Sequence, residues 1–193
     1  MPAEPKLDPN EILKAEYNYI AATVFQANED RSRVASFYFV TVGSLVAAIL
    51  SAIFSTSDLN GVLFAFSALF VVLTILGTLT LAQLARLRAA WHESVEAMNR
   101  IKDYYIENNK KIEPAFKWRL KTLPPTDKKF SIANLMAVEI TLLSAITSAA
   151  AMYFLLAAFG DIEWWGWILL LVVFVATYIA LWKWYKYLLV DNQ

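Results

Sequence analysis

The 193-residue chain has no cysteine, one histidine (His92), five glycines and a charged fraction of only 18%. Without cysteine it has no thiol nucleophile, no disulfide and no thiolate metal site. A single histidine excludes a bis-histidine haem site within one chain. Neither a glycine-rich phosphate loop nor a G-x-S-x-G elbow occurs. His92 and Glu96 could form half of a metal site, but a solvated or ion-paired histidine is the simpler interpretation. We expect no catalytic residues, cofactor or metal.

What the chain has in excess is apolar residues, which make up 59% of it against about 45–50% in ordinary soluble domains. They fall in four blocks, at 36–55, 62–82, about 139–159 and 164–182. A helix needs about 20 apolar residues to cross a bilayer core. The sequence therefore predicts an all-α integral membrane protein with four transmembrane helices.

The charges are unevenly placed along the chain. All 17 basic residues lie in 1–33, in the central connection 86–129 or after residue 182. The connections 56–61 and 160–163 contain acids but no base. The positive-inside rule then places both termini and the central connection in the cytoplasm of a multi-pass protein of the inner (plasma) membrane. Because residues 1–33 are polar and acidic, we expect no cleavable signal peptide.

Two of the predicted helices extend beyond the membrane. Asp8 and Pro9 are typical of a helix start, and no breaker follows until Gly43, so one helix is expected over about 9–54. The second helix continues past the membrane, and both carry apolar residues at alternating spacings of three and four. We call these positions the cytoplasmic seam: Leu13, Tyr17, Ile20 and Val24 on the first helix, and Leu87, Trp91, Met98, Ile101 and Tyr105 on the second.

The seams predict that the two helices pack as an antiparallel helical hairpin extending into the cytoplasm. The simpler interpretation is that they bury only each other, and the alternative is that they also meet another copy or subunit. The expected division is a cytoplasmic helix at 1–33, a transmembrane hairpin at 34–86, a cytoplasmic helix with an interfacial linker at 87–129, and a second transmembrane hairpin at 130–193.

Basic and aromatic residues mark the expected membrane surface. Asn108-Asn109, Pro114 and Pro124-Pro125 should break any long helix, and the segment between the prolines suits the lipid headgroup region. A nucleic-acid partner is not expected there, because anionic lipid is the nearer polyanion. Glu29 and Arg33 are spaced to form an ion pair. The membrane-surface candidates are Arg31, Arg33, Trp118, Lys128 and Lys129.

Within the spans, small and hydroxyl residues have two interpretations. Gly43 and Ala47, and Ala137, Thr141 and Ala145, recur at four-residue spacing, as in closely packed transmembrane helices. The hydroxyl residues could pack likewise or line a passive pore: Thr41, Ser44, Ser51, Ser144, Thr147 and Ser148.

Glu139 is the one acidic residue that falls within the four apolar blocks. It could be an interfacial structural acid or a buried ion or proton site. No span contains an internal proline, which disfavours a secondary transporter. A lipid-modifying enzyme built on Glu139 is the weakest hypothesis.

These features favour a non-catalytic membrane protein that assembles as a homo-oligomer or as an accessory subunit, with membrane lipids as its other partners. The alternative is a passive channel or pore-forming effector. The layout of a cytoplasmic helix, a transmembrane pair and an amphipathic connection resembles small bacterial membrane effectors that assemble into pores. The resemblance is one of arrangement alone, and the second pair of spans departs from it.

Overall fold

The computed structural model describes residues 8–53 and 59–190, and all regular structure within these ranges is helical. The long helices are α1 (Pro9–Ile53), α2 (Leu59–Asn108), α3 (Ile132–Ala157) and α4 (Trp164–Val190). Two 3-10 helices, η1 (Lys110–Ala115) and η2 (Leu120–Thr122), lie between α2 and α3. Each of the four α-helices is long and apolar enough to cross a membrane, as in a multi-pass membrane protein. The prediction of four such helices is confirmed.

The local signals that begin and end these helices act as expected. Asp8 accepts a hydrogen bond from the backbone of Asn10 at 2.9 Å, so α1 begins at Pro9. α2 ends at Asn108, and Asn109 caps η1 by accepting from the Lys111 backbone at 3.2 Å. The predicted last residue of the first helix, Phe54, and the acidic connection around Asp58 lie outside the described residues.

The span near Glu139 belongs to a longer helix than the counted 20 residues. Ser131 caps α3 by accepting from the Asn134 backbone at 3.3 Å, so α3 begins at Ile132, seven residues before Glu139. The predicted boundary near residue 139 came from counting about 20 residues back from Phe159, the length needed to cross a bilayer. The helix begins earlier than this boundary because Ser131 caps it. At the other end, Gly160 adopts a φ of 137°, which favours glycine, and the chain turns toward α4.

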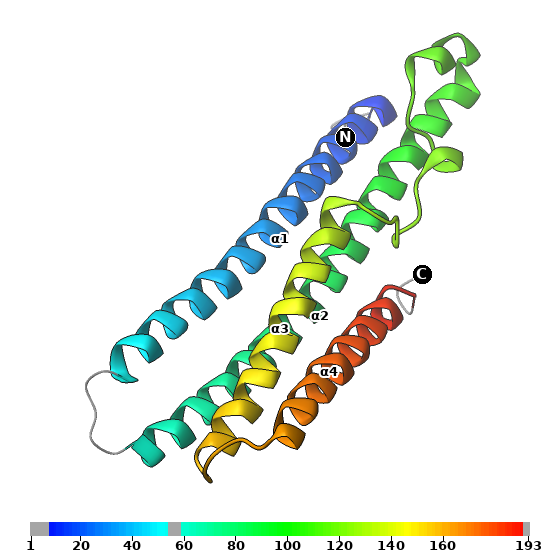
Figure 1. Cartoon of the computed structure of the whole chain (residues 1–193). Coiled ribbons are helices and arrows are strands. Elements are labelled where there is room, and N and C mark those ends of the chain that lie inside the picture. Colours follow the sequence, from blue (N-terminus) through cyan, green and yellow to red (C-terminus); the bar gives the residue numbers. More distant parts are fainter. Residues whose placement is uncertain (1–7, 54–58, 191–193) are drawn as a thin grey trace, which may run out of the picture.

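α2 is the central element of the molecule and contacts the other three α-helices. α1 runs antiparallel to it along one side, and α3 packs against another side (Figure 1). α4 packs mainly on α3 and partly on α2, whereas α1 and α3 touch little. The core between them is apolar, with Leu73, Leu81 and Ile140 fully buried.

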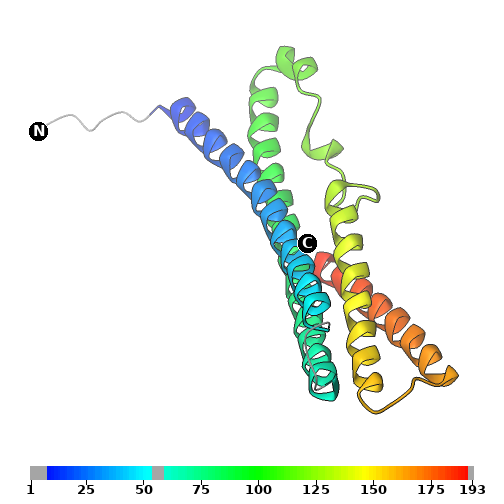
Figure 2. The same ribbon diagram turned by 60° about the vertical axis from the view of Figure 1, so that its left-hand side comes forward.

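The two longest helices separate toward the start of α1. In Figure 2 the first turns of α1 diverge from the last turns of α2, whereas farther along α1 the two helices pack together. Between α2 and α3 the chain passes through η1 and η2, both of which contact α2. The molecule therefore has a closed helical bundle at one end and an open helix pair with a folded-back linker at the other.

Candidate functional site

α1, α2 and α3 meet at Gly77. The hydroxyls of Tyr38 and Ser144 lie 3.1 Å apart in the core. A methyl group at Gly77 would collide with both of these hydroxyl groups. Only glycine leaves room at this point for the side chains of Tyr38 and Ser144.

The hydroxyl residues of α3 make contacts between helices. In addition to the Ser144 contact, the Thr147 hydroxyl lies 3.0 Å from the Thr74 hydroxyl of α2. The Ser148 hydroxyl lies 3.1 Å from the Thr177 hydroxyl of α4. The small-residue positions Ala137, Thr141 and Ala145 of α3 are fully buried against the neighbouring helices. This face of α3 is a packing face within the single chain.

The small and hydroxyl residues considered on α1 mostly face outward. Gly43, Ser44, Ala47 and Ser51 are exposed, and nothing lies within 4 Å of the position that a side chain at Gly43 would take. Thr41 is half-buried and donates to the Phe37 carbonyl at 2.8 Å. The six hydroxyl residues considered for a pore therefore do not share one opening within the chain, and a pore among several copies stays a prediction.

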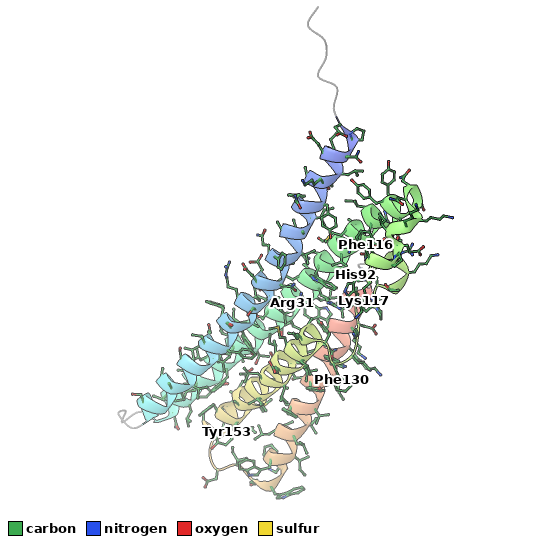
Figure 3. The ribbon with its side chains drawn as sticks, turned by 90° about the horizontal axis from the view of Figure 1, so that it is seen from above. Arg31, His92, Phe116, Lys117, Phe130 and Tyr153 are labelled. Carbon is green, nitrogen blue, oxygen red and sulfur yellow. The ribbon has the colours of Figure 1, made fainter. Side chains whose placement is uncertain are left out.

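The candidate ionisable residues lie on two helices, His92 and Glu96 on α2 and Glu139 on α3. Glu139 is exposed on α3, and His92 is half-buried on α2 (Figure 3). Glu96 pairs with Arg100 at 2.7 Å. In residues 8–53 and 59–190, no three His, Asp or Glu side chains gather as metal ligands would.

The cytoplasmic seam is only partly closed. Ile20 is buried, and the hydroxyls of Thr23 and Ser94 lie 3.4 Å apart between α1 and α2. The other seam residues are half-buried: Leu13, Tyr17, Val24, Leu87, Trp91, Met98, Ile101 and Tyr105.

Where α1 and α2 diverge, the seam lines an open apolar groove of about 480 Å³. We call it the α1–α2 groove, lined by Asn10, Leu13, Lys14, Tyr17, Ile101, Lys102, Tyr105 and Phe116. Burial lowers the pKa of Lys102, whose ammonium group donates to Asn99 at 3.1 Å. The groove is therefore apolar in its walls, with a partly desolvated cation at its edge.

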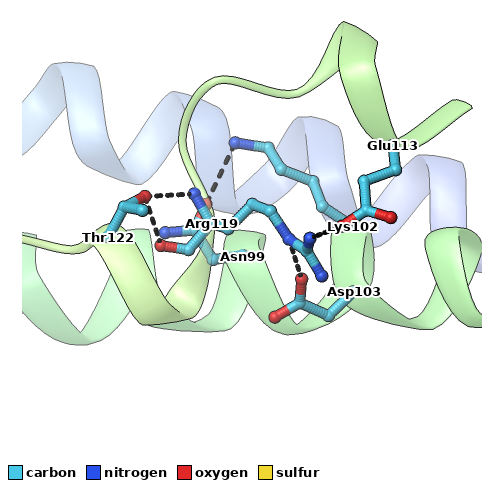
Figure 4. A network of polar contacts seen from close by, with 6 residues as sticks. All are labelled: Asn99, Lys102, Asp103, Glu113, Arg119 and Thr122. Atoms are coloured by element: carbon cyan, nitrogen blue, oxygen red, sulfur yellow. Dashed lines mark hydrogen bonds and ion pairs between the residues drawn. The ribbon is translucent and has the colours of Figure 1, made fainter.

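A network of ion pairs holds the linker against α2 (Figure 4). Arg119 donates to Asp103 of α2 at 3.0 Å and also pairs with Glu113 of η1. These hydrogen bonds and charges raise the pKa of Arg119, the bond to Asp103 most of all. The same linker brings Phe116 to the groove and leaves Trp118 exposed.

The membrane-surface candidates divide into exposed and buried residues. Arg33, Lys128 and Lys129 are exposed, as is Trp118, but Arg31 is buried between the helices (Figure 3). The expected pair of Glu29 with Arg33 is wrong, because Arg33 pairs with Asp30 at 3.5 Å. On a helix, residues three apart can form an ion pair as readily as residues four apart.

Three residues with special roles were missed from the sequence: Gly77, Arg88 and Asn99. Asn99 is buried under the linker, and one of its amide atoms has no hydrogen-bond partner. Arg88 is buried like Arg31. A signal for both arginines exists in the pairs Arg31-Ser32-Arg33 and Arg86-Leu87-Arg88. Residues two apart on a helix point in nearly opposite directions, so the two arginines of each pair lie on different faces of the helix.

Comparison of the chain with protein-family models, with curated proteins and with solved structures found no match.

Proposed function

We propose that this chain is a non-catalytic membrane protein that self-associates through the α1–α2 groove. All four helices cross the bilayer, and both termini and the linker lie in the cytoplasm, where the positive-inside rule places the basic residues. α1 and α2 then form a helical hairpin that extends into the cytoplasm with the start of α1 and the end of α2. In this arrangement the groove is in water and the outer faces of the spans are in lipid.

The observation that carries the proposal is the open groove itself. Leu13, Tyr17, Ile101 and Tyr105 present apolar surface that α1 and α2 do not bury against each other. Such surface costs free energy in water, about 25 cal/mol for each Å², and a second copy can cover it. The exposed face around Gly43 and Ala47 offers a close contact between copies within the bilayer.

The experiment is a mass measurement of the purified full chain in detergent by light scattering, at several protein concentrations. We expect a complex of two or more copies. Leu13→Glu should shift it toward the monomer, because a carboxylate would enter the covered groove. Ile12→Glu is the matched control, since Ile12 is the adjacent residue and faces solvent.

A monomer at every concentration, or equal effects of the two variants, contradicts self-association through the groove. If light scattering gives a monomer while crosslinking in native membranes traps a heterologous subunit, the chain is an accessory subunit instead.

A second candidate function is a passive pore formed by several copies. The outward hydroxyl residues Thr41, Ser44 and Ser51 favour it, because they could face a shared axis in an assembly. Purified protein in liposomes should then give single-channel currents that change with Ser44→Leu. A silent bilayer across a wide voltage range contradicts this function.

A further inference from the structure

A small cavity lies where the linker meets α3 and where α4 ends. It has a volume of about 210 Å³ and is separate from the α1–α2 groove, because none of its wall residues belongs to α1 or α2. Its walls are formed by Asp127, Lys129 and Phe130 of the linker, Asn134 of α3, and Trp182, Tyr185, Lys186 and Leu189 of α4. Tyr185 and Leu189 are buried, so the cavity has a closed apolar floor.

The cavity lies where the apolar spans meet the basic end of the molecule. Trp182 is the last residue of the fourth apolar block, and Lys186 follows it by about one helical turn. On the other wall, Lys129 lies three residues before Ile132, where α3 begins. Aromatic and basic residues at the ends of membrane spans meet the lipid headgroups. In a bilayer the cavity is therefore at headgroup level.

The walls of the cavity are basic on balance. Lys129 and Lys186 contribute two ammonium groups, against the one carboxylate of Asp127. No ion pair joins either lysine to an acid within residues 8–53 and 59–190. The Lys186 ammonium group lies over the Trp182 ring, 5.5 Å from its centroid. The first turn of α3, which includes Asn134, adds the positive end of a helix dipole. The cavity therefore favours an anion.

Aromatic rings give the same cavity an apolar side. The rings of Trp182 and Tyr185 stack with their centroids 5.7 Å apart. Phe130, between the start of α3 and the end of α4, is 85% exposed (Figure 3). Its φ of 57° is a conformation that a bulky residue seldom adopts. A ring displayed in this way is unfavourable in water and suits the membrane interface.

We propose that this cavity binds the phosphate of an anionic phospholipid between Lys129 and Lys186, with the first part of its acyl chains against Phe130 and Trp182. Ammonium groups donate charge-assisted hydrogen bonds to phosphate oxygens. The cavity is smaller than the about 300–1,000 Å³ of pockets that enclose a drug-sized ligand, so it suits a headgroup whose chains remain in the bilayer. The site rests on the proposed insertion of the helices in a bilayer and not on self-association, so a monomer can also bind the lipid.

Native mass spectrometry of the delipidated full chain in a nonionic detergent measures three affinities. The ligands are short-chain phosphatidylglycerol, diacylglycerol with the same chains but no phosphate, and glycerophosphoglycerol, which is the same headgroup without the chains. We expect phosphatidylglycerol to bind at least about tenfold tighter than diacylglycerol, the ratio that one charge-assisted hydrogen bond provides. Glycerophosphoglycerol should also bind more weakly, because it lacks the apolar contacts with Phe130 and Trp182. Equal affinity for diacylglycerol overturns recognition of the phosphate, and equal affinity for glycerophosphoglycerol overturns the assignment to a lipid.

Two matched pairs of lysines separate the cavity from the general attraction of a basic surface. Lys129→Gln with Lys186→Gln removes both ammonium groups that line the cavity and should abolish the preference for phosphatidylglycerol over diacylglycerol. Lys128→Gln with Lys183→Gln removes the same charge from exposed neighbours that do not line it, and should leave the preference within about twofold. Equal losses in both pairs overturn the site, because the lysines would then act only as a charged surface.

Stability does not obscure this comparison. All four lysines are exposed, so we expect both pairs of substitutions to leave the fold intact. If loss of the contact between Lys186 and Trp182 nevertheless unfolds the first pair, Lys129→Gln alone provides the test. It should lower the preference for phosphatidylglycerol severalfold, and an unchanged preference overturns the proposal.

Discussion

At the scale of single residues, the bundle is held by small and hydroxyl side chains where its helices cross. Tyr38 and Ser144 meet over Gly77, and Thr74 meets Thr147 about one turn away. In a bilayer, where apolar surface gains little from leaving lipid, such contacts and close backbone approach hold helices together.

Gly77→Ala should destabilise the protein by about 1–3 kcal/mol, because the added methyl group collides with the hydroxyls of Tyr38 and Ser144. Thermal unfolding in detergent measures the loss. Gly43→Ala is the control, since its methyl group would meet nothing within 4 Å and alanine favours a helix by up to about 1 kcal/mol. A Tm for Gly77→Ala equal to that of the unsubstituted chain would show that the crossing is looser than described.

Arg119→Gln should release the linker from α2, because it removes the ion pairs with Asp103 and Glu113. A lysine-specific protease should then cut at Lys117 and Lys121 several times faster, while its cleavage sites remain the same. Arg100→Gln breaks an exposed pair on the same helix, with Glu96, and should not change the rate. Equal cleavage of the two variants would mean that other contacts hold the linker.

At the scale of elements, the molecule is organised around α1 and α2, which run about 68 Å and 75 Å at 1.5 Å per residue. Their shared part is closed by buried residues such as Ile20 and Ala35, whereas their far ends diverge around the α1–α2 groove. The same pair thus provides the packed bundle and, in the proposed function, the surface for another copy.

The absence of native cysteine makes the pairing of α1 with α2 directly testable. Thr23→Cys with Ser94→Cys should form an intrachain disulfide on mild oxidation, because the two hydroxyls that they replace lie 3.4 Å apart. Phe25→Cys with Ser94→Cys should remain reduced, since Phe25 faces solvent. A gel-mobility assay after thiol blocking reports the bond. Equal crosslinking of both pairs would contradict the observed register.

At the scale of the whole molecule, the net charge of zero conceals two different ends. The turn between α3 and α4 has Asp161 and Glu163 and no base, while Lys117, Lys121 and Lys129 belong to the linker at the other end (Figure 1). In a membrane this asymmetry predicts the orientation of the chain.

Single cysteines can test that orientation in intact cells. Glu163→Cys should react with a membrane-impermeant maleimide added outside, and Lys117→Cys should react only after the cells are opened. Both residues are exposed, so burial does not limit the reaction. The reverse pattern would invert the proposed topology, and labelling of both from outside would contradict the proposed membrane insertion.

Much of the fold could be predicted from local signals. The cap at Asp8, the Asn108-Asn109 break and the four apolar blocks act over a few residues, so they can be recognised without knowing the neighbours. The cap at Ser131 was not recognised, and the start of α3 was placed seven residues too late. The hydroxyl residues were harder to interpret, because packing and pore lining require the same side chains. Only the neighbouring helices show that Ser144 and Thr147 pack while Ser44 faces outward.

By itself, the sequence determined the number of long helices, the start of α1, the end of α2 and the separation of charge, because hydrophobicity, caps and breakers are properties of short segments. The tertiary structure decided which face of each helix is covered. It buried Arg31 and Arg88 and left Arg33 and Arg86 exposed, left the far end of the seam open, and made Gly77 a crossing point. These outcomes depend on the relative rotation of α1, α2 and their neighbours, which is set by the summed packing of all the helices.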